Sequence, residues 1–371
     1  MDIGINYPWY NYAWDFGTPP RGWTPRAPWT AHIANDLAAF KRCGVKVVRW
    51  FILADGMTYG YDGYAPRRSS NQWRFDRIPA IDQTVLDDFR QLLQVFSRRG
   101  MKLLPVLIDF HWAFPGLDRT TQDCPTLEAW YGSAARPMSE AQLQEARKKA
   151  RSHPQGYVKG GRSDLIHDPT KSSQFFRRVL EPLLAVSRRH RETIYAWELI
   201  NEPEWITSPK SLHDGNLPDA QRIPLSRMLR FIREGMTTIQ RYGFRATVGF
   251  AKALTIPNWE RSMPSGRSLG MDLNQIHYYP RVKTDVLTPA NFPNQLRGVL
   301  GEFASRTGIS ACDRNKIDWP ELSNGTDNVT ERLILARSKR YAAAFPWSYR
   351  AVDCATQPNR STIETALSGY T

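Results

Sequence analysis

The sequence has few cysteines. Its 371 residues include four, namely Cys43, Cys124, Cys312 and Cys354, and these form neither a C-x-x-C pair nor a zinc-site spacing. A chain of this length can bury a large core without disulfides or metals. We expect Cys43, at the end of a predicted helix, to be a buried thiol, and a disulfide between Cys312 and Cys354 stays open.

Long apolar runs are also absent. No stretch approaches the roughly 18 to 20 apolar residues of a membrane span, so we expect no membrane contact. Met1 leads directly into a predicted strand, with no signal peptide before it. The prediction is either a cytoplasmic protein or an exported one whose signal has been removed.

Nucleotide-binding and metal-binding motifs are missing. No G-x-G-x-x-G follows the first strand, and no Walker-type Gly-Lys-Ser/Thr loop occurs. The histidines are scattered, without the spacing of metal ligands. We therefore predict no metal and no other cofactor.

Basic residues and tryptophan are abundant. The formal net charge is +14, but the Lys and Arg residues are spread over helical faces, and no DNA- or RNA-binding motif accompanies them. Their densest run is residues 147–151. We interpret the charge as a solvated basic surface, with an acidic polysaccharide as the alternative partner and no nucleic acid. The 13 tryptophans offer flat apolar faces that suit sugar rings.

Short apolar runs alternate with helical patterns along the chain. The eight predicted strands are residues 3–7, 45–53, 103–110, 194–200, 246–250, 273–279, 299–303 and 345–349. Amphipathic helices follow several of them, with stops at Gly44, Gly100 and Gly243 and an N-cap at Asp168 before Pro169. This alternation predicts an α/β fold. An open doubly wound sheet would give a similar periodicity, but its nucleotide-binding signature is missing, so we predict a (β/α)8 TIM barrel.

Two connections are longer than usual. Residues 8–29 form an extended first βα loop, and residues 111–167 form a long insertion after the third strand, with a predicted helix at 139–150. Such excursions are usually lids or binding walls. With no linker or repeat, we expect one catalytic domain over residues 1–371, and a monomer.

Two strand ends carry glutamates. The fourth strand ends in Asn201-Glu202-Pro203 and the seventh in Gly301-Glu302. Strands four and seven lie on opposite sides of a barrel, so both side chains can reach one pocket. Glycosidic bond cleavage needs such a pair, one acid for the leaving oxygen and one carboxylate for the anomeric carbon. We expect the negative charge of Glu302 to raise the pKa of Glu202 and keep it protonated.

These motifs resemble those of clan A glycoside hydrolases, and within that clan the chain is most similar to family 5, the cellulase and mannanase group. The resemblance implies that Glu202 is the acid/base and Glu302 the nucleophile of a retaining enzyme. It also implies substrate-binding roles for six residues: Arg49, His111, Asn201, His277, Tyr279 and Trp347.

Each implied role has a physical basis. Asn201 can bond the 2-hydroxyl of the reacting sugar, and Arg49 can hold Glu302 ionised and oriented. Tyr279 can donate to the same carboxylate, and Trp347 can form a platform under the ring. His111 and His277 offer donors to sugar hydroxyls or to a catalytic glutamate. Glu198 and Glu204 are interpreted as structural ion-pair or capping residues.

The leading hypothesis is endo-acting hydrolysis of a β-glucan or β-mannan. The long insertion leaves two alternatives open, an exo-acting β-glycosidase and a hydrolase of an acidic exopolysaccharide. A carbohydrate-binding barrel without catalysis is a further alternative from another class of protein. Sugar identity is set by loop residues and does not follow from the fold.

Overall fold

The structure is a computed structural model. It describes residues 1–10, 15–17, 29–54, 67–69, 72–74, 78, 80–110, 112–113, 117–118, 159–160, 163–209, 222–278, 289, 292, 296–303, 329–347, 367 and 370.

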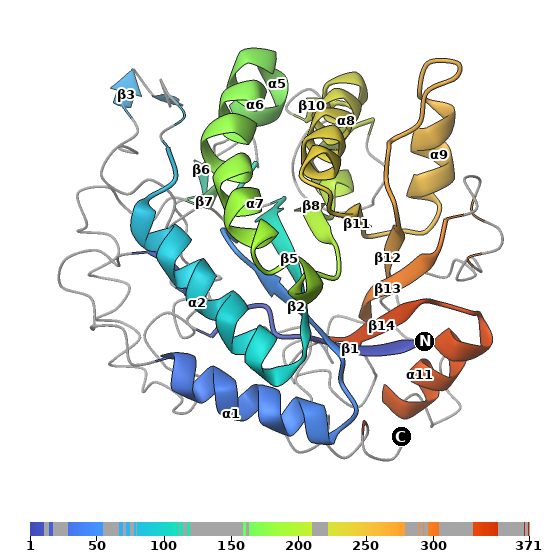
Figure 1. The fold of residues 1–371 in the computed structure, drawn as a ribbon. Coiled ribbons are helices and arrows are strands. Elements are labelled where there is room, and N and C mark those ends of the chain that lie inside the picture. The colour runs from blue at the N-terminus through green and yellow to red at the C-terminus, as the bar shows by residue number, and fades with distance from the viewer. Residues whose placement is uncertain are drawn as a thin grey trace, which may run out of the picture.

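Eight parallel strands close into a barrel, in the order β1-β14-β13-β12-β11-β8-β5-β2 (Figure 1). Their bounds are β1 Asp2–Asn6, β2 Val47–Phe51, β5 Lys102–Asp109, β8 Trp197–Asn201, β11 Ala246–Phe250, β12 Asn274–Tyr278, β13 Gly298–Phe303 and β14 Ala343–Pro346. Each strand pairs with its neighbours in the chain, and β14 pairs with β1. The predicted (β/α)8 fold is confirmed.

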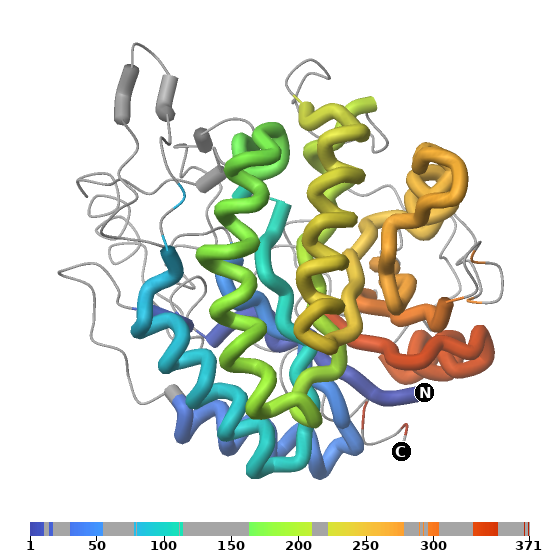
Figure 2. The backbone as a smooth tube through the Cα atoms, turned by 45° about the horizontal axis from the view of Figure 1, so that its top comes forward, coloured from blue at the N-terminus to red at the C-terminus, as the bar shows by residue number. Residues whose placement is uncertain are grey.

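Helices cover the outside of the barrel, and the green and yellow segments run side by side along it (Figure 2). Their bounds are α1 Trp29–Arg42, α2 Gln83–Arg99, α5 Asp164–His167, α6 Pro169–Phe175, a π-helical turn Phe176–Leu180, α7 Glu181–Arg188, α8 Leu225–Arg241, α9 Thr255–Arg261 and α11 Val329–Ser338. Two 3-10 turns, Arg191–Thr193 and Pro203–Ile206, precede and follow β8.

Within the described ranges, three short two-stranded sheets lie outside the barrel. They pair β3 Arg67–Ser69 with β4 Gln72–Arg74, β6 Leu117–Asp118 with β7 Lys159–Gly160, and β9 Thr207–Ser208 with β10 Ile223–Pro224.

The helix ends follow the local sequence. Asp82 caps α2 by accepting from the backbone N–H of Thr84, and Gly100 ends the helix at φ 63°, a left-handed conformation that glycine adopts without strain. Asp168 caps α6 in the same way, with Pro169 at its first position. The stop at Gly100 and the cap at Asp168 were predicted, and the cap at Asp82 was not.

The last strand differs from its prediction. It covers Ala343–Pro346 instead of residues 345–349. Its alanines carry little strand signal, but they pair with Ile3 of β1 and Leu300 of β13. The ring of Phe345 packs where a Cβ on Gly4 would lie, 2.3 Å from that position. Close packing therefore sets this strand, and the sequence alone does not show it.

Helix α9 was not among the predicted helices, because it is short and has a proline inside it. Cys43 is a buried thiol, as expected. Cys124, Cys312, Cys354 and the predicted helix at 139–150 lie outside the described residues, and so does most of the insertion. Among the helices that are described, none is long and apolar enough to cross a membrane.

Candidate active site

The two predicted catalytic carboxylates lie together at the end of the barrel where the parallel strands terminate. Glu302 is in β13, and Glu202 directly follows β8. One oxygen of each and a ring nitrogen of His277 all lie within 4.8 Å of one another. Glu302 is buried, with a side chain 4% exposed, whereas that of Glu202 is 12% exposed. Glu202 is therefore the more solvent-accessible of the two carboxylates.

Arg49 in β2 binds the buried carboxylate. Its Nη1 lies 2.5 Å from Oε1 of Glu302 and also donates to Asn6 of β1 at 2.9 Å. Its Nε and Nη2 donate to the two oxygens of Glu198 at 2.7 Å each, a bidentate pair. Burial alone would lower the pKa of Arg49, but the charges of Glu198 and Glu302 outweigh it and raise that pKa. Arg49 is therefore a permanent cation between two buried anions.

Glu202 has a backbone conformation that is rare for a residue with a side chain. Its φ is 46° and its ψ 52°, in the left-handed region, and its N–H donates to the carbonyl of Gly249 at 2.7 Å. Such positions cost about 1 to 3 kcal/mol and cluster at functional sites. The unusual turn carries the carboxylate out of the strand and over the barrel mouth.

Two side chains orient the Glu202 carboxylate. Nε1 of Trp205 donates to Oε2 at 2.8 Å, and Nδ1 of His277 lies 2.8 Å from Oε1. The Trp205 ring stacks on Phe110 at the end of β5, with ring centroids 6.1 Å apart. Because the indole N–H only donates, Oε2 of Glu202 is fixed as an acceptor.

His277 in β12 is neutral. Burial lowers its pKa to about 4, and the nearby Glu302 carboxylate only partly opposes this effect. The amide nitrogen of Gln275, which also donates to Glu198 at 2.6 Å, lies 3.4 Å from Nε2 of the ring. Since this amide is a donor, we assign the ring proton to Nδ1, where it points at Glu202.

Asn201 ends β8 beside the acid. Its Oδ1 accepts from Arg49 at 2.8 Å, and its Nδ2 donates to Asp109 of β5 at 2.9 Å. An amide nitrogen has two hydrogens, so Nδ2 keeps one for another acceptor. The side chain is thereby oriented by two strands before any substrate arrives.

Trp347, just after β14, belongs to an aromatic cluster. Its ring meets those of Trp9 and Phe51 edge-on, at centroid distances of 6.4 and 6.5 Å. Phe51 in turn lies under the guanidinium of Arg49, whose Cζ is 4.9 Å from the ring centroid. Trp347 is 8% exposed, so its ring is part of the wall of the site and does not form an open surface.

The structure therefore brings together Arg49, Asn201, Glu202, His277 and Glu302, with Trp347 beside Arg49 through Phe51. His111 and Tyr279 lie outside the described residues, and their roles stay predictions.

Several polar residues of the site were not predicted. Glu198 and Gln275 are fully buried and complete the hydrogen bonds around Arg49. Asn6, which accepts from Arg49, is itself held in place because its Nδ2 donates to the carbonyl of Gly301 at 2.9 Å. A signal existed, because Arg49 and Glu198 are opposite charges with apolar neighbours on both sides in two strands. Buried charges need partners, and these two satisfy one another.

Glu204 is a fourth glutamate near the site. It is fully buried, its Oε1 accepts from the backbone N–H of Lys252 at 3.2 Å, and burial raises its pKa to about 7. This contact joins the turn that carries Glu202 to the loop after β11.

By distance alone, Glu202, His277 and Glu302 could also hold a metal ion. Their atoms are engaged with one another, however, and Arg49 already supplies the positive charge beside Glu302. We therefore interpret the group as a two-carboxylate centre, and the absence of a metal stays a prediction.

No protein-family model matches the chain, and no curated protein sequence matches it. Solved structures do. The endo-1,4-β-mannanase of the earthworm Eisenia fetida matches with a TM-score of 0.60 at 20% identity, over 99% of this chain and 89% of that one. The β-mannanase of the mussel Mytilus edulis gives 0.62 at 16%, over 99% and 91%. The β-1,4-mannanase of the sea hare Aplysia kurodai gives 0.57 at 18%, over 100% and 92%. At these identities the likeness shows the barrel fold.

Proposed function

We propose that this chain is a retaining β-glycoside hydrolase, with Glu202 as the acid/base and Glu302 as the nucleophile. The observation that carries the proposal is the pair itself, two carboxylates from β8 and β13 with oxygens within 4.8 Å of one another. Retaining enzymes hold their carboxyl groups about 5 to 5.5 Å apart, whereas inverting enzymes leave about 6.5 to 9.5 Å for a water molecule.

The surroundings support different roles for the two glutamates. Glu302 is buried against the guanidinium of Arg49, which favours the ionised form that attacks the anomeric carbon. Glu202 is the more exposed of the two, and Trp205 and His277 fix the direction of its carboxyl group. In the first step Glu202 protonates the leaving oxygen while Glu302 forms a glycosyl ester.

The second step uses the same groups in reverse. The ester removes the negative charge of Glu302, so Glu202 can remain ionised and take a proton from water. That water attacks the anomeric carbon, and the bond to Glu302 breaks to release the carboxylate. Asn201 is oriented to donate its remaining amide hydrogen to the 2-hydroxyl of the sugar, a contact worth several kcal/mol in the transition state.

We propose a β-1,4-mannan as the first substrate to test, with β-glucan second. The solved structures of similar fold named above are mannanases, and this favours mannan. Endo action is the leading expectation and exo action the alternative, which product lengths from a defined manno-oligosaccharide would separate.

The test is reducing-sugar release from mannan, β-glucan, xylan and an acidic polysaccharide. We expect release from one neutral β-glycan, and a loss of at least about a thousandfold in Glu302→Ala. Glu192→Ala, at an exposed glutamate, is the control and should keep full activity. If Glu302→Ala hydrolyses the glycan like the wild type, the assignment of the nucleophile is wrong.

The non-catalytic alternative makes a different prediction. Such a barrel would bind the glycan but release no sugar from it or from an activated aryl β-glycoside. Proton NMR of the first product would test retention, since a retaining enzyme yields the β-anomer first. An α-anomer as first product would contradict the role of Glu302 as nucleophile.

A further inference from the structure

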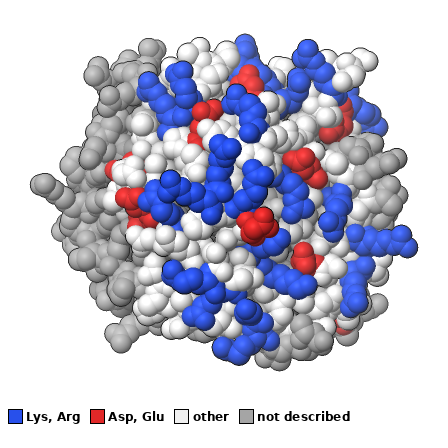
Figure 3. Space-filling view, viewed as in Figure 1, with Lys and Arg blue, Asp and Glu red and all other residues white. Residues whose placement is uncertain are grey.

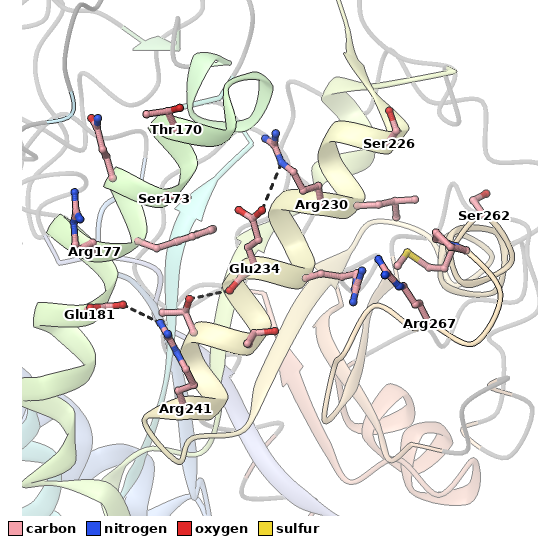
Figure 4. A pocket seen from close by; sticks show the side chains of 18 residues that line it. Thr170, Ser173, Arg177, Glu181, Ser226, Arg230, Glu234, Arg241, Ser262 and Arg267 are labelled. Atoms are coloured by element: carbon pink, nitrogen blue, oxygen red, sulfur yellow. Dashed lines mark hydrogen bonds and ion pairs between the residues drawn. The ribbon is translucent and has the colours of Figure 1, made fainter.

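A second hollow lies on the outer wall of the barrel, away from the carboxylates. It is a groove of about 920 Å³ along α8, with α6, the π-helical turn and α7 on one side and the segment after α9 on the other (Figure 4). Its lining runs from Ser226, near the start of α8, to Arg241 at the end of that helix. At 1.5 Å per residue this is about 22 Å, longer than a single sugar ring.

The groove is strongly basic. Five arginines line it against two glutamates: Arg177, Arg230, Arg233, Arg241 and Arg267 against Glu181 and Glu234. The same face of the molecule shows many more blue than red side chains (Figure 3).

Both glutamates are already engaged. Glu181 pairs with Arg241 at 3.0 Å, and Glu234 lies 3.9 Å from Arg230 on the same helix. Among the described residues, Arg177, Arg233 and Arg267 have no carboxylate partner. Three positive charges therefore line one groove without a described carboxylate beside them, an arrangement that attracts anions.

The rest of the lining indicates what kind of anion fits. Hydroxyl groups stand between the arginines, from Thr170, Ser173, Ser226, Thr237 and Ser262. Phe176 is the one aromatic residue among the described lining residues and it is buried, so the described lining offers no surface on which a nucleic-acid base can stack. Guanidinium groups bind carboxylates and sulfates through paired donors, and hydroxyl groups suit sugars.

We propose that this groove binds an acidic polysaccharide, a chain of sugars that carries carboxylate or sulfate groups. One end of the groove opens beside the first turn of α8, on the face of the barrel where Glu202 also lies, because α8 follows the loop after β8. A bound chain would thus be held along the barrel wall with one end directed toward that face. Binding can be measured without turnover, so the inference does not depend on the proposed hydrolysis.

The experiment is a titration of the full chain with polygalacturonate, dextran sulfate and neutral galactomannan, at low and at physiological salt. We expect both acidic polymers to bind and binding to weaken with salt. The two acidic probes distinguish a carboxylate ligand from a sulfate ligand. If neither binds the wild-type protein, the inference is wrong.

The groove variant is Arg177→Gln with Arg233→Gln and Arg267→Gln. These side chains are exposed or half-buried and unpaired within the described chain, so the fold should be retained. We expect binding of the acidic polymers to weaken by about tenfold or more. The single variant Arg267→Gln, in the segment after α9, should weaken binding about twofold to threefold. It replaces the triple variant in the binding test if the triple variant unfolds.

The matched control removes the same charge elsewhere, with Arg42→Gln, Arg98→Gln and Arg337→Gln. These arginines are exposed and outside the groove. A change of less than about threefold is expected, because only the general field is reduced. Equal losses in the two triple variants would show unspecific attraction and overturn the site, as would tighter binding of single-stranded DNA through the groove arginines.

Discussion

Replacing Arg49 with methionine tests the electrostatic centre of the site. The substitution keeps an unbranched side chain of similar length but removes the cation that binds Glu198 and Glu302. Both carboxylates are buried, so neither can regain its lost interactions from water. Folding then requires that one of them takes up a proton or stays charged without the Arg49 cation beside it.

The magnitude follows from the protonation. Breaking a buried ion pair costs about 3 to 5 kcal/mol. Holding an ordinary glutamate protonated costs about 4 kcal/mol at pH 7 and about 1 kcal/mol at pH 5, since each pH unit is worth about 1.4 kcal/mol. We therefore expect Arg49→Met to lose about 4 kcal/mol of unfolding free energy at pH 7. At pH 5 the loss should be smaller by about 3 kcal/mol. In the variant, folding raises the pKa of the carboxyl that takes up the proton. The unfolding free energy of the variant therefore falls as pH rises.

The assay is urea unfolding followed by tryptophan fluorescence at both pH values. Arg245→Met is the control, because that arginine donates to the carbonyl of Tyr195 and covers its ring but has no carboxylate partner among the described residues. Its loss should be about 1 kcal/mol at either pH. If Arg49→Met loses no more than this control, or loses the same amount at both pH values, the buried carboxylates do not depend on Arg49. Should the variant be unfolded at pH 7, Arg49→Lys tests the same reasoning, with stability partly regained because the charge is kept.

Three further predictions concern residues around this centre. Glu204→Gln removes a carboxyl whose pKa is about 7 in the folded state. The wild type loses stability as this carboxyl ionises, so the melting temperature of the variant minus that of the wild type should rise between pH 5 and pH 8. A constant difference would contradict the raised pKa. Gly249→Ala places a Cβ 2.3 Å from Oε1 of Glu198 and 2.8 Å from Nε2 of His277, and should cost about 1 to 3 kcal/mol in urea unfolding; wild-type stability would mean that these side chains move freely. Trp347→Ala should raise KM for the glycan about tenfold with a smaller change in kcat, and an unchanged KM would remove this ring from the substrate site.

Much of the fold could be predicted from the sequence, because buried parallel strands are apolar runs and helices have a 3.6-residue period. The strand made of alanines was displaced in the prediction, since its position depends on the packing of Phe345 against Gly4. Helix α9 was missed because seven residues with an internal proline carry too little periodicity.

The site was predictable where chemistry leaves a motif and not where it depends on pairing. Glu202 and Glu302 stand at strand ends beside Asn201 and Gly301, and these neighbouring residues distinguish them from the other glutamates. Glu198 has no such motif, and its function in the site comes from its bidentate pair with Arg49 across the barrel. The left-handed backbone of Glu202 likewise follows from the tertiary structure, as nothing in its residue type favours it.

The arginine groove shows the same limit. Its unpaired arginines come from the π-helical turn, α8 and the segment after α9, and none of them stands in the densest basic run of the sequence. Only the packing of the helices makes them neighbours.

The hydrogen bonds of Arg49 also have a consequence for folding kinetics. They join residues separated by 43, 149, 152 and 253 positions in the chain, so β1, β2, β8 and β13 must all be in place before the guanidinium has its partners. Contacts of such long range form late, since the loops between them must close first. During refolding, the proposed hydrolase activity should then return together with closure of the ring of strands, and its turnover would report the final step of folding.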